Sequence, residues 1–161
     1  MRIITIGVAE QTIASAPDKI VTLGLGSCIG LVLYDPVIKK GGMVHIMLPT
    51  ASAHSTVTNR FKFADTAIVD MIDMMVKAGA SRSRLRSKIA GGAHMFKTSG
   101  SIDIMNVGQR NIAMCRKVLD KNRIILEGDD TGGSSGRSIE FCCESCKLSI
   151  RTVSPKTVKV I

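Results

Sequence analysis

Three short apolar runs in the N-terminal third of the chain constrain its fold most strongly. They cover residues 20–25, 29–34 and 43–48, and they are rich in β-branched and other apolar side chains. A Gly-Ser-Cys turn at 26–28 separates the first two runs, and an Asp-Pro dipeptide at 35–36 ends the second. Runs of this length, with so few residues between them, predict short β-strands joined by tight turns and hence an antiparallel meander.

Two later segments have the spacing of amphipathic helices. Between residues 59 and 78, apolar side chains recur at intervals of three and four, with Thr58 or Asn59 as the expected cap and Gly79 as the stop. Residues 108–120 repeat the pattern. Further strands are expected at 3–8, 88–93, 123–127, 138–142 and 147–153, and a Gly-rich loop at 128–137. The patterns predict one α+β domain over residues 1–161, with a mostly antiparallel sheet core and two main helices.

Composition supports a folded domain and narrows the class of partner. The 161 residues are 45% hydrophobic, which is enough for a sizeable core and excludes a disordered chain. Lys and Arg total 22 against 13 for Asp and Glu, and this net charge of +9 predicts an anionic partner. Aromatic residues are only 3%, which argues against the base-stacking surfaces of single-stranded nucleic-acid binders. We therefore expect no nucleic-acid partner.

The sequence also lacks the signals of membrane insertion and export. No apolar run approaches the ~20 residues of a transmembrane helix. The first eight residues hold one charge and a short apolar run without the small-residue cleavage site of a signal peptide. We expect a cytoplasmic protein without membrane insertion, whose five cysteines are free thiols.

Cys28 is the thiol best placed for chemistry. It lies in a glycine-flanked turn between two strand-like runs, where backbone N–H groups can face a developing oxyanion. A cysteine nucleophile needs a base or a positive neighbour. His45 is the candidate base, since a hairpin between the second and third runs would bring it near Cys28. From the residues alone, Cys28 is equally well explained as a buried small residue, and His45 better as a half-buried structural histidine.

The remaining groups are weaker candidates. Cys142, Cys143 and Cys146 suggest zinc or an iron–sulfur centre, but no fourth ligand is near and adjacent strand residues face opposite ways. We therefore expect neither a metal nor a cofactor. The loop at 131–137 lacks the spacing of a phosphate cradle and is expected to face a substrate, or else to be a plain hairpin loop. His54 and His94 are poorer candidates for a base than His45.

Four sequence blocks resemble the chemoreceptor glutamine deamidase CheD family. They are TLGLGSC at 22–28, GMVHIMLP at 42–49, KIAGGAHMF at 88–96 and NVGQRN at 106–111, and DTGGSSGR at 130–137 fits the same family. The resemblance runs in order from about residue 2 to 155. It implies a β-sandwich-like, mostly antiparallel sheet core flanked by helices, similar to the catalytic domains of deamidating cytotoxic necrotizing toxins.

The same resemblance implies an activity and its residues. The protein would hydrolyse glutamine side chains of bacterial chemoreceptors to glutamate and ammonia. Carried over to this sequence, Cys28 is the nucleophile, His45 the general base and Thr22 the residue that orients the imidazole. To reach His45, Thr22 must lie beside it on a neighbouring strand after the chain folds back at residues 24–26. The cysteines at 142, 143 and 146 are not part of the family pattern and stay unassigned.

Two kinds of partner follow from the resemblance. Methyl-accepting chemoreceptors are the implied substrate, and a CheC-type chemotaxis phosphatase is the implied second partner. The alternative to an enzyme is a mainly non-enzymatic regulator that binds such a phosphatase. For the enzyme, the positive net charge would favour encounter with receptor helices rich in glutamate.

Overall fold

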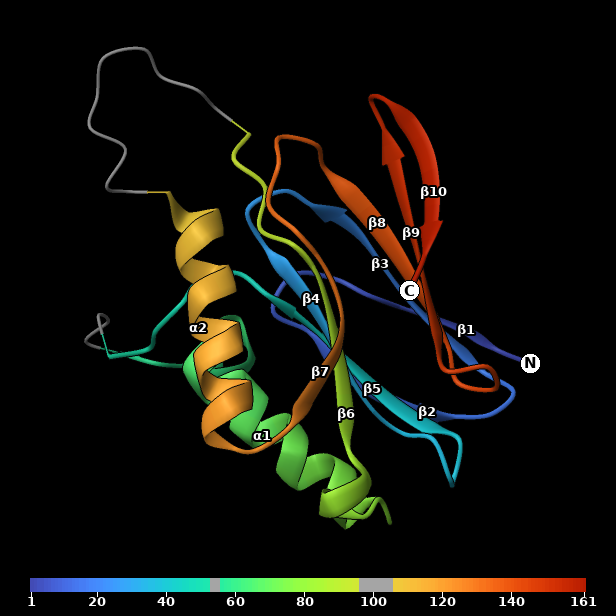
Figure 1. Cartoon of the computed structure of the whole chain (residues 1–161). Helices are drawn as coiled ribbons and strands as arrows, with labels where there is room; N and C mark the ends of the chain where they lie inside the picture. The colour runs from blue at the N-terminus through green and yellow to red at the C-terminus, as the bar shows by residue number, and fades with distance from the viewer. Residues whose placement is uncertain (53–55, 96–105) are drawn as a thin grey trace, which may run out of the picture.

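Ten strands form two five-stranded sheets in the part of the chain that the computed structural model describes, residues 1–52, 56–95 and 106–161. The outer sheet has the order β1 (Ile3–Ile6), β3 (Lys19–Leu25), β8 (Arg137–Cys142), β9 (Lys147–Val153), β10 (Lys156–Val160). The central sheet has the order β2 (Gln11–Ser15), β5 (Lys40–Ile46), β4 (Ile29–Asp35), β6 (Arg86–Gly91), β7 (Ile125–Thr131). Helices α1 (Ala64–Lys77) and α2 (Val107–Lys121) lie side by side on the other face of the central sheet, so the molecule has three layers (Figure 1).

The predicted α+β class and the mostly antiparallel sheets are confirmed. Among the described strands, six of the eight pairings are antiparallel. The parallel pairs are β1 with β3 and β6 with β7, and the second pair is joined through α2, as a parallel connection requires. The similarity to toxin catalytic domains stays a prediction.

The predicted meander is wrong at its first turn. Strands β4 and β5 do form an antiparallel pair, but β3 pairs with β1 and β8 in the other sheet. The chain therefore changes sheets between residues 25 and 29. Burial explains the change: every residue of β4 is buried, because a sheet covers one face and helices the other, whereas β3 has a solvent-facing side.

Two hydrophobic cores hold the layers together. One lies between the two sheets and contains Leu25, Val32, Met43, Ile139 and Phe141 among others. The other lies between the central sheet and the helices, and its members include the methionine stripe of α1 at Met71 and Met75. The sequence interpretation of these methionines as core residues is therefore confirmed.

Several boundaries differ from the prediction. Helix α1 begins at Ala64, because residues 60–62 form a short 3-10 turn that Asn59 caps. Gly79 follows the helix with φ +102°, a left-handed conformation that suits glycine, as expected of a stop. Strand β7 extends to Thr131, so the predicted loop begins only at residue 132. Neither β2 nor β10 is predicted by the sequence pattern. No helix in the described residues is long and apolar enough to cross a membrane.

Candidate active site

Thr22 and His45 meet across the space between the two sheets. Thr22 lies in β3 of the outer sheet and His45 in β5 of the central sheet, and both side chains are fully buried. Thr22 Oγ1 lies 2.8 Å from His45 Nδ1 and donates its hydrogen to the Ile6 carbonyl oxygen at 2.9 Å. Because that hydrogen is already used, Oγ1 accepts from the imidazole, so Nδ1 carries the proton and Nε2 is left as the basic nitrogen.

The expected contact is present, but not by the expected route. The expectation from the sequence is that Thr22 lies beside His45 on a neighbouring strand, whereas the structure joins them face to face between the two sheets. Gly30, which pairs with His45 in the central sheet, explains how the sheets come so close. A Cβ at Gly30 would lie 2.4 Å from Ile139 Cδ1 of β8, so only glycine allows this approach.

Cys28 lies one residue before β4 and shares the face of His45. The register pairs Ile29 with Ile46 and Gly30 with His45, so Cys28 is diagonal to His45 in the antiparallel pair. Alternate residues of a strand point to one face, and diagonal neighbours lie about 7–8 Å apart, within reach of longer side chains. The half-buried Cys28 packs against the core between the sheets, which is also the side that holds Thr22. The structure therefore gathers all three predicted site residues at one end of this inter-sheet space.

The segment at the end of β6, residues 91–93, holds the turn that carries Cys28. Ala93 N–H donates to the Gly26 carbonyl at 2.8 Å, and Gly92 N–H donates to the Cys28 carbonyl at 2.9 Å. Gly91 has φ +112°, and a Cβ there would lie 2.2 Å from the Cys28 carbonyl oxygen, so this position requires glycine. Residues 91–93, the Gly-Gly-Ala part of the sequence block at 88–96, thus hold the turn through their backbone.

Burial keeps both reacting groups neutral. It raises the pKa of the Cys28 thiol above its ordinary 9.0 and lowers the pKa of His45 below its ordinary 6.5. Among the described residues, His45 Nε2 is buried and has no hydrogen-bond partner. The resting pair is therefore a thiol and a neutral imidazole, and a free base is ready to take a proton during nucleophilic attack.

A cavity of about 650 Å³ opens beside the same turn. Its walls are residues 24–26, residues 134–138 at the end of the Gly-rich loop and the start of β8, and the end of β9 with the exposed Arg151. Met95 also lines the cavity and packs against Gly26, where an added Cβ would be 3.2 Å from Met95 Cγ. Residues 134–137 of the loop that we expect to face a substrate thus line a cavity next to the turn that carries Cys28.

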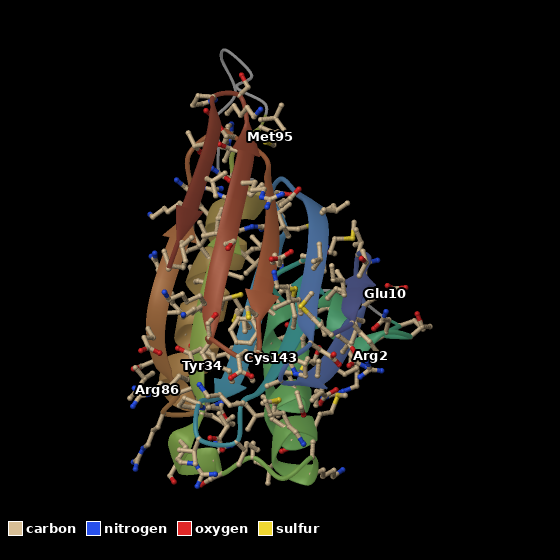
Figure 2. All side chains as sticks on the ribbon, turned by 90° about the vertical axis from the view of Figure 1, so that its right-hand side faces the viewer. Arg2, Glu10, Tyr34, Arg86, Met95 and Cys143 are labelled. Atoms are coloured by element: carbon tan, nitrogen blue, oxygen red, sulfur yellow. The ribbon has the colours of Figure 1, made fainter. Side chains whose placement is uncertain are left out.

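The other sequence candidates lie elsewhere. Cys142 is half-buried and paired in register with Lys19, whereas Cys143 and Cys146 pack toward the core between the sheets. Cys143 is far from Met95 along the molecule (Figure 2). The described residues contain no group of three His, Cys, Asp or Glu side chains placed for a metal. His94 follows residues 91–93, and its backbone N–H donates to the Gly133 carbonyl. His54 lies outside the described residues.

Asn111 is the site residue that the sequence reasoning missed. It lies in α2, fully buried, and its Nδ2 donates to the carbonyls of Ser27 at 2.9 Å and Met47 at 3.0 Å. The available signal was its spacing, since Asn111, Cys115 and Val118 fall on one buried helix face where a polar residue is unusual.

Comparison with known proteins relates the chain to one family. The family model described as CheD chemotactic sensory transduction matches residues 47–152. The "Chemoreceptor glutamine deamidase CheD" of Bacillus subtilis is 47% identical over 152 residues, covering 94% of this chain and 92% of the relative. That of Bacillus velezensis is 49% identical with the same coverage. The "Probable chemoreceptor glutamine deamidase CheD" of Caldanaerobacter subterraneus is 46% identical and covers 94% of both chains.

A solved structure is similar more distantly. The crystal structure of Bacillus licheniformis hypothetical protein YfiH matches with a TM-score of 0.45 and 13% identity, covering 78% of this chain and 50% of the other.

Proposed function

Because this chain belongs to the CheD family, we propose that it is a protein-glutamine deamidase that converts glutamine side chains of chemoreceptors to glutamate in chemotaxis. The observation that carries the proposal is the hydrogen bond between Thr22 Oγ1 and the buried His45 Nδ1. It leaves Nε2 as a base on the face of the central sheet that Cys28 shares. Residues 1–161 then act together as one deamidase domain.

The first chemical step in this proposal is attack by Cys28. Its Sγ forms a bond to the side-chain carbonyl carbon of the glutamine while His45 Nε2 takes the thiol proton. The carbonyl π electrons move to oxygen, and the resulting oxyanion needs hydrogen-bond donors. The backbone N–H groups of Ser27 and Cys28 are the donors closest to the reacting sulfur in sequence.

The next steps return the enzyme to its starting state. The His45 imidazolium gives its Nε2 proton to the amide nitrogen, and the C–N bond breaks. Ammonia departs, and the acyl group stays bound to Cys28 as a thioester. A water molecule then attacks the thioester while Nε2 takes one of its protons. The C–S bond breaks, the sulfur regains a proton and glutamate is released. Thr22 accepts the Nδ1 hydrogen throughout, although a hydroxyl stabilises imidazolium less than a carboxylate does.

We assign substrate binding to the cavity beside residues 24–26. It adjoins the turn of Cys28, and its walls combine exposed backbone, serine side chains and Arg151. Arginine suits recognition of carboxylates, which are expected around the target glutamines of an acidic receptor segment. The net charge of +9 would also speed the encounter with such a segment.

A CheC-type chemotaxis phosphatase is the second partner that we propose, on the basis of the family resemblance. The cytoplasm is the proposed location, as expected from the sequence. The interpretation as a regulator without enzymatic activity is not favoured, because the relatives of this chain are named as deamidases. A buried threonine–histidine hydrogen bond is moreover a feature that a binding surface does not need.

Ammonia release from purified receptor protein tests the proposal. The wild type should release ammonia, Cys28→Ala should release none, and Cys142→Ser should keep most of the activity because Cys142 lies away from the Cys28 turn. Cys115→Ala is a second control, since Cys115 is buried between the helices and the sheet, where burial raises its pKa to about 12. Full activity of a folded Cys28→Ala protein would contradict the assignment of the nucleophile.

A further inference from the structure

We propose that Asn111 is a positioning residue that aims the Cys28 peptide N–H at the oxyanion of the reaction. The inference rests on the proposed function and adds a residue from the helix layer to it. Asn111 touches no substrate in this proposal. It acts through the backbone of the turn that carries the nucleophile.

The side-chain amide of Asn111 links the two halves of the site. Its Nδ2 donates one hydrogen to the carbonyl of Ser27, the residue before Cys28, at 2.9 Å. It donates the other to the carbonyl of Met47, two residues after His45, at 3.0 Å. A single buried group therefore fixes the nucleophile's turn against the end of the strand that carries the base.

The planarity of the peptide group transmits this contact to Cys28. In a trans peptide the C=O of Ser27 and the N–H of Cys28 point in opposite directions. Asn111 holds the Ser27 carbonyl toward α2, on the helix side of the central sheet (Figure 1). The Cys28 N–H must then point away from the helices. The hydrogen bonds of the described residues include none donated by this N–H.

The direction of this N–H agrees with the position of the cavity. The cavity beside residues 24–26 has walls from residues 134–138, which lead into β8, and from β9, and both strands belong to the outer sheet. A glutamine carbonyl that enters there reaches the turn from the side opposite α2. The Cys28 N–H is thus free and directed to that side, as an oxyanion donor must be.

Burying Asn111 has a cost, which its two donated hydrogen bonds must offset. Its Oδ1 is buried and, within the described part of the chain, has no hydrogen-bond partner. A buried unpaired acceptor costs roughly 1–3 kcal/mol. An apolar side chain on this helix face would avoid that cost, but it would leave the carbonyls of Ser27 and Met47 without this donor. The amide is therefore kept for the two backbone carbonyls that it holds, one in the turn of Cys28 and one at the end of the strand of His45.

Two reactions of Cys28 separate this role from general support of the fold. Deamidation passes through an oxyanion, and loss of one oxyanion donor lowers kcat by about 10²–10³-fold. Alkylation by iodoacetamide is a displacement at carbon and forms no oxyanion, so it reports only the thiol and its base. A residue that aims the peptide N–H should affect the first reaction and not the second.

The experiment compares Asn111→Leu with Asn122→Leu in both reactions. Asn122 ends the same helix and its Nδ2 also donates to a carbonyl, that of Val118, but it does not contact the site. We expect Asn111→Leu to lower kcat for ammonia release by up to about 10²-fold. Its KM and the rate and pH dependence of Cys28 alkylation should stay near wild type. Asn122→Leu should leave both reactions unchanged.

Other outcomes contradict the inference. A wild-type kcat in folded Asn111→Leu, or an equal loss of alkylation and deamidation, would reduce Asn111 to a structural role. If Asn111→Leu fails to fold, Asn111→Ser serves instead, because its single hydroxyl can donate to only one of the two carbonyls. The same separation of the two reactions is expected of it, and its absence would refute the inference. A wild type that is alkylated but releases no ammonia from receptors would instead refute the proposed function.

Discussion

Replacing Thr22 by valine should remove the group that orients the base His45 while leaving the shape of the site unchanged. Valine has nearly the same volume, so the packing between the sheets is retained. What disappears is the acceptor that lies 2.8 Å from His45 Nδ1 and the donor that lies 2.9 Å from the Ile6 carbonyl oxygen. Both former partners are then left without this hydrogen bond.

The size of the effect follows from these two bonds. Hydrogen bonds to charged groups contribute about 1.5–3 kcal/mol, and the imidazolium forms only as Cys28 attacks. Loss of this contribution in the transition state corresponds to about 10-fold to 150-fold in kcat. The free energy of unfolding should also fall by roughly 1–3 kcal/mol, since a buried carbonyl and N–H lose their partner.

The assay measures turnover on receptor protein and stability in urea for three variants. Thr22→Ser keeps the oxygen and should keep much of the activity. Ser87→Ala is the matched control, because Ser87 is a buried hydroxyl that donates to a strand carbonyl, that of Ile125, at 2.9 Å and does not contact His45. It should lose stability but not turnover. Equal turnover for wild type and a folded Thr22→Val protein would refute the role of Thr22 and leave a Cys28–His45 pair.

Three further predictions concern pH and salt. The acid limb of kcat/KM should have its midpoint below pH 6.5, because burial lowers the pKa of His45, and any alkaline limb should have its midpoint above pH 9.0, because burial raises the pKa of Cys28. An acid limb centred above pH 6.5 would contradict this. Raised ionic strength should slow association with the receptor more than the chemical step, and an association rate that is flat across a salt series would exclude electrostatic steering. Burial opposes ionisation of Asp35, but hydrogen bonds from Arg84, Ser81 and Val37 hold its pKa at about 2 against an ordinary 3.8. Its carboxylate should therefore contribute up to about 2 kcal/mol of stability above pH 3.8 that is lost as the pH falls toward 2. Urea unfolding between pH 5 and 2 should show a larger loss of stability in the wild type than in Asp35→Asn, and equal losses would contradict this.

The local pattern of the sequence predicts which segments are strands or helices, but not which sheet a strand joins. Runs such as 29–34 and 43–48 are apolar and bounded by turns, and they form β4 and β5. The edge strand β10 escapes prediction because all five of its residues are exposed, so no alternation marks it. The partner of β3 is β8, more than a hundred residues later, and local periodicity contains no information on such a pairing.

For the site as well, local sequence patterns predict some residues, whereas others depend on contacts between distant segments. The glycine-flanked turn and the alternating strand are local features, and they are enough to propose Cys28 and His45. Thr22 came only from the family resemblance, because its contact with His45 depends on the separation of two sheets at Gly30. Asn111 depends in addition on how α2 docks on the central sheet, and a helix pattern gives only the face that is buried.

Mass spectrometry of receptor peptides tests the central claim most directly. Receptor protein is incubated with wild type, Cys28→Ala or Cys142→Ser and digested, and the mass of each glutamine-containing peptide is measured. Hydrolysis of a glutamine side chain through a thioester adds ~1 Da to that peptide. We predict this gain at particular glutamines with wild type and Cys142→Ser, and no gain with Cys28→Ala. Unchanged receptor peptides with wild type, or the same gain with a folded Cys28→Ala protein, would contradict the account.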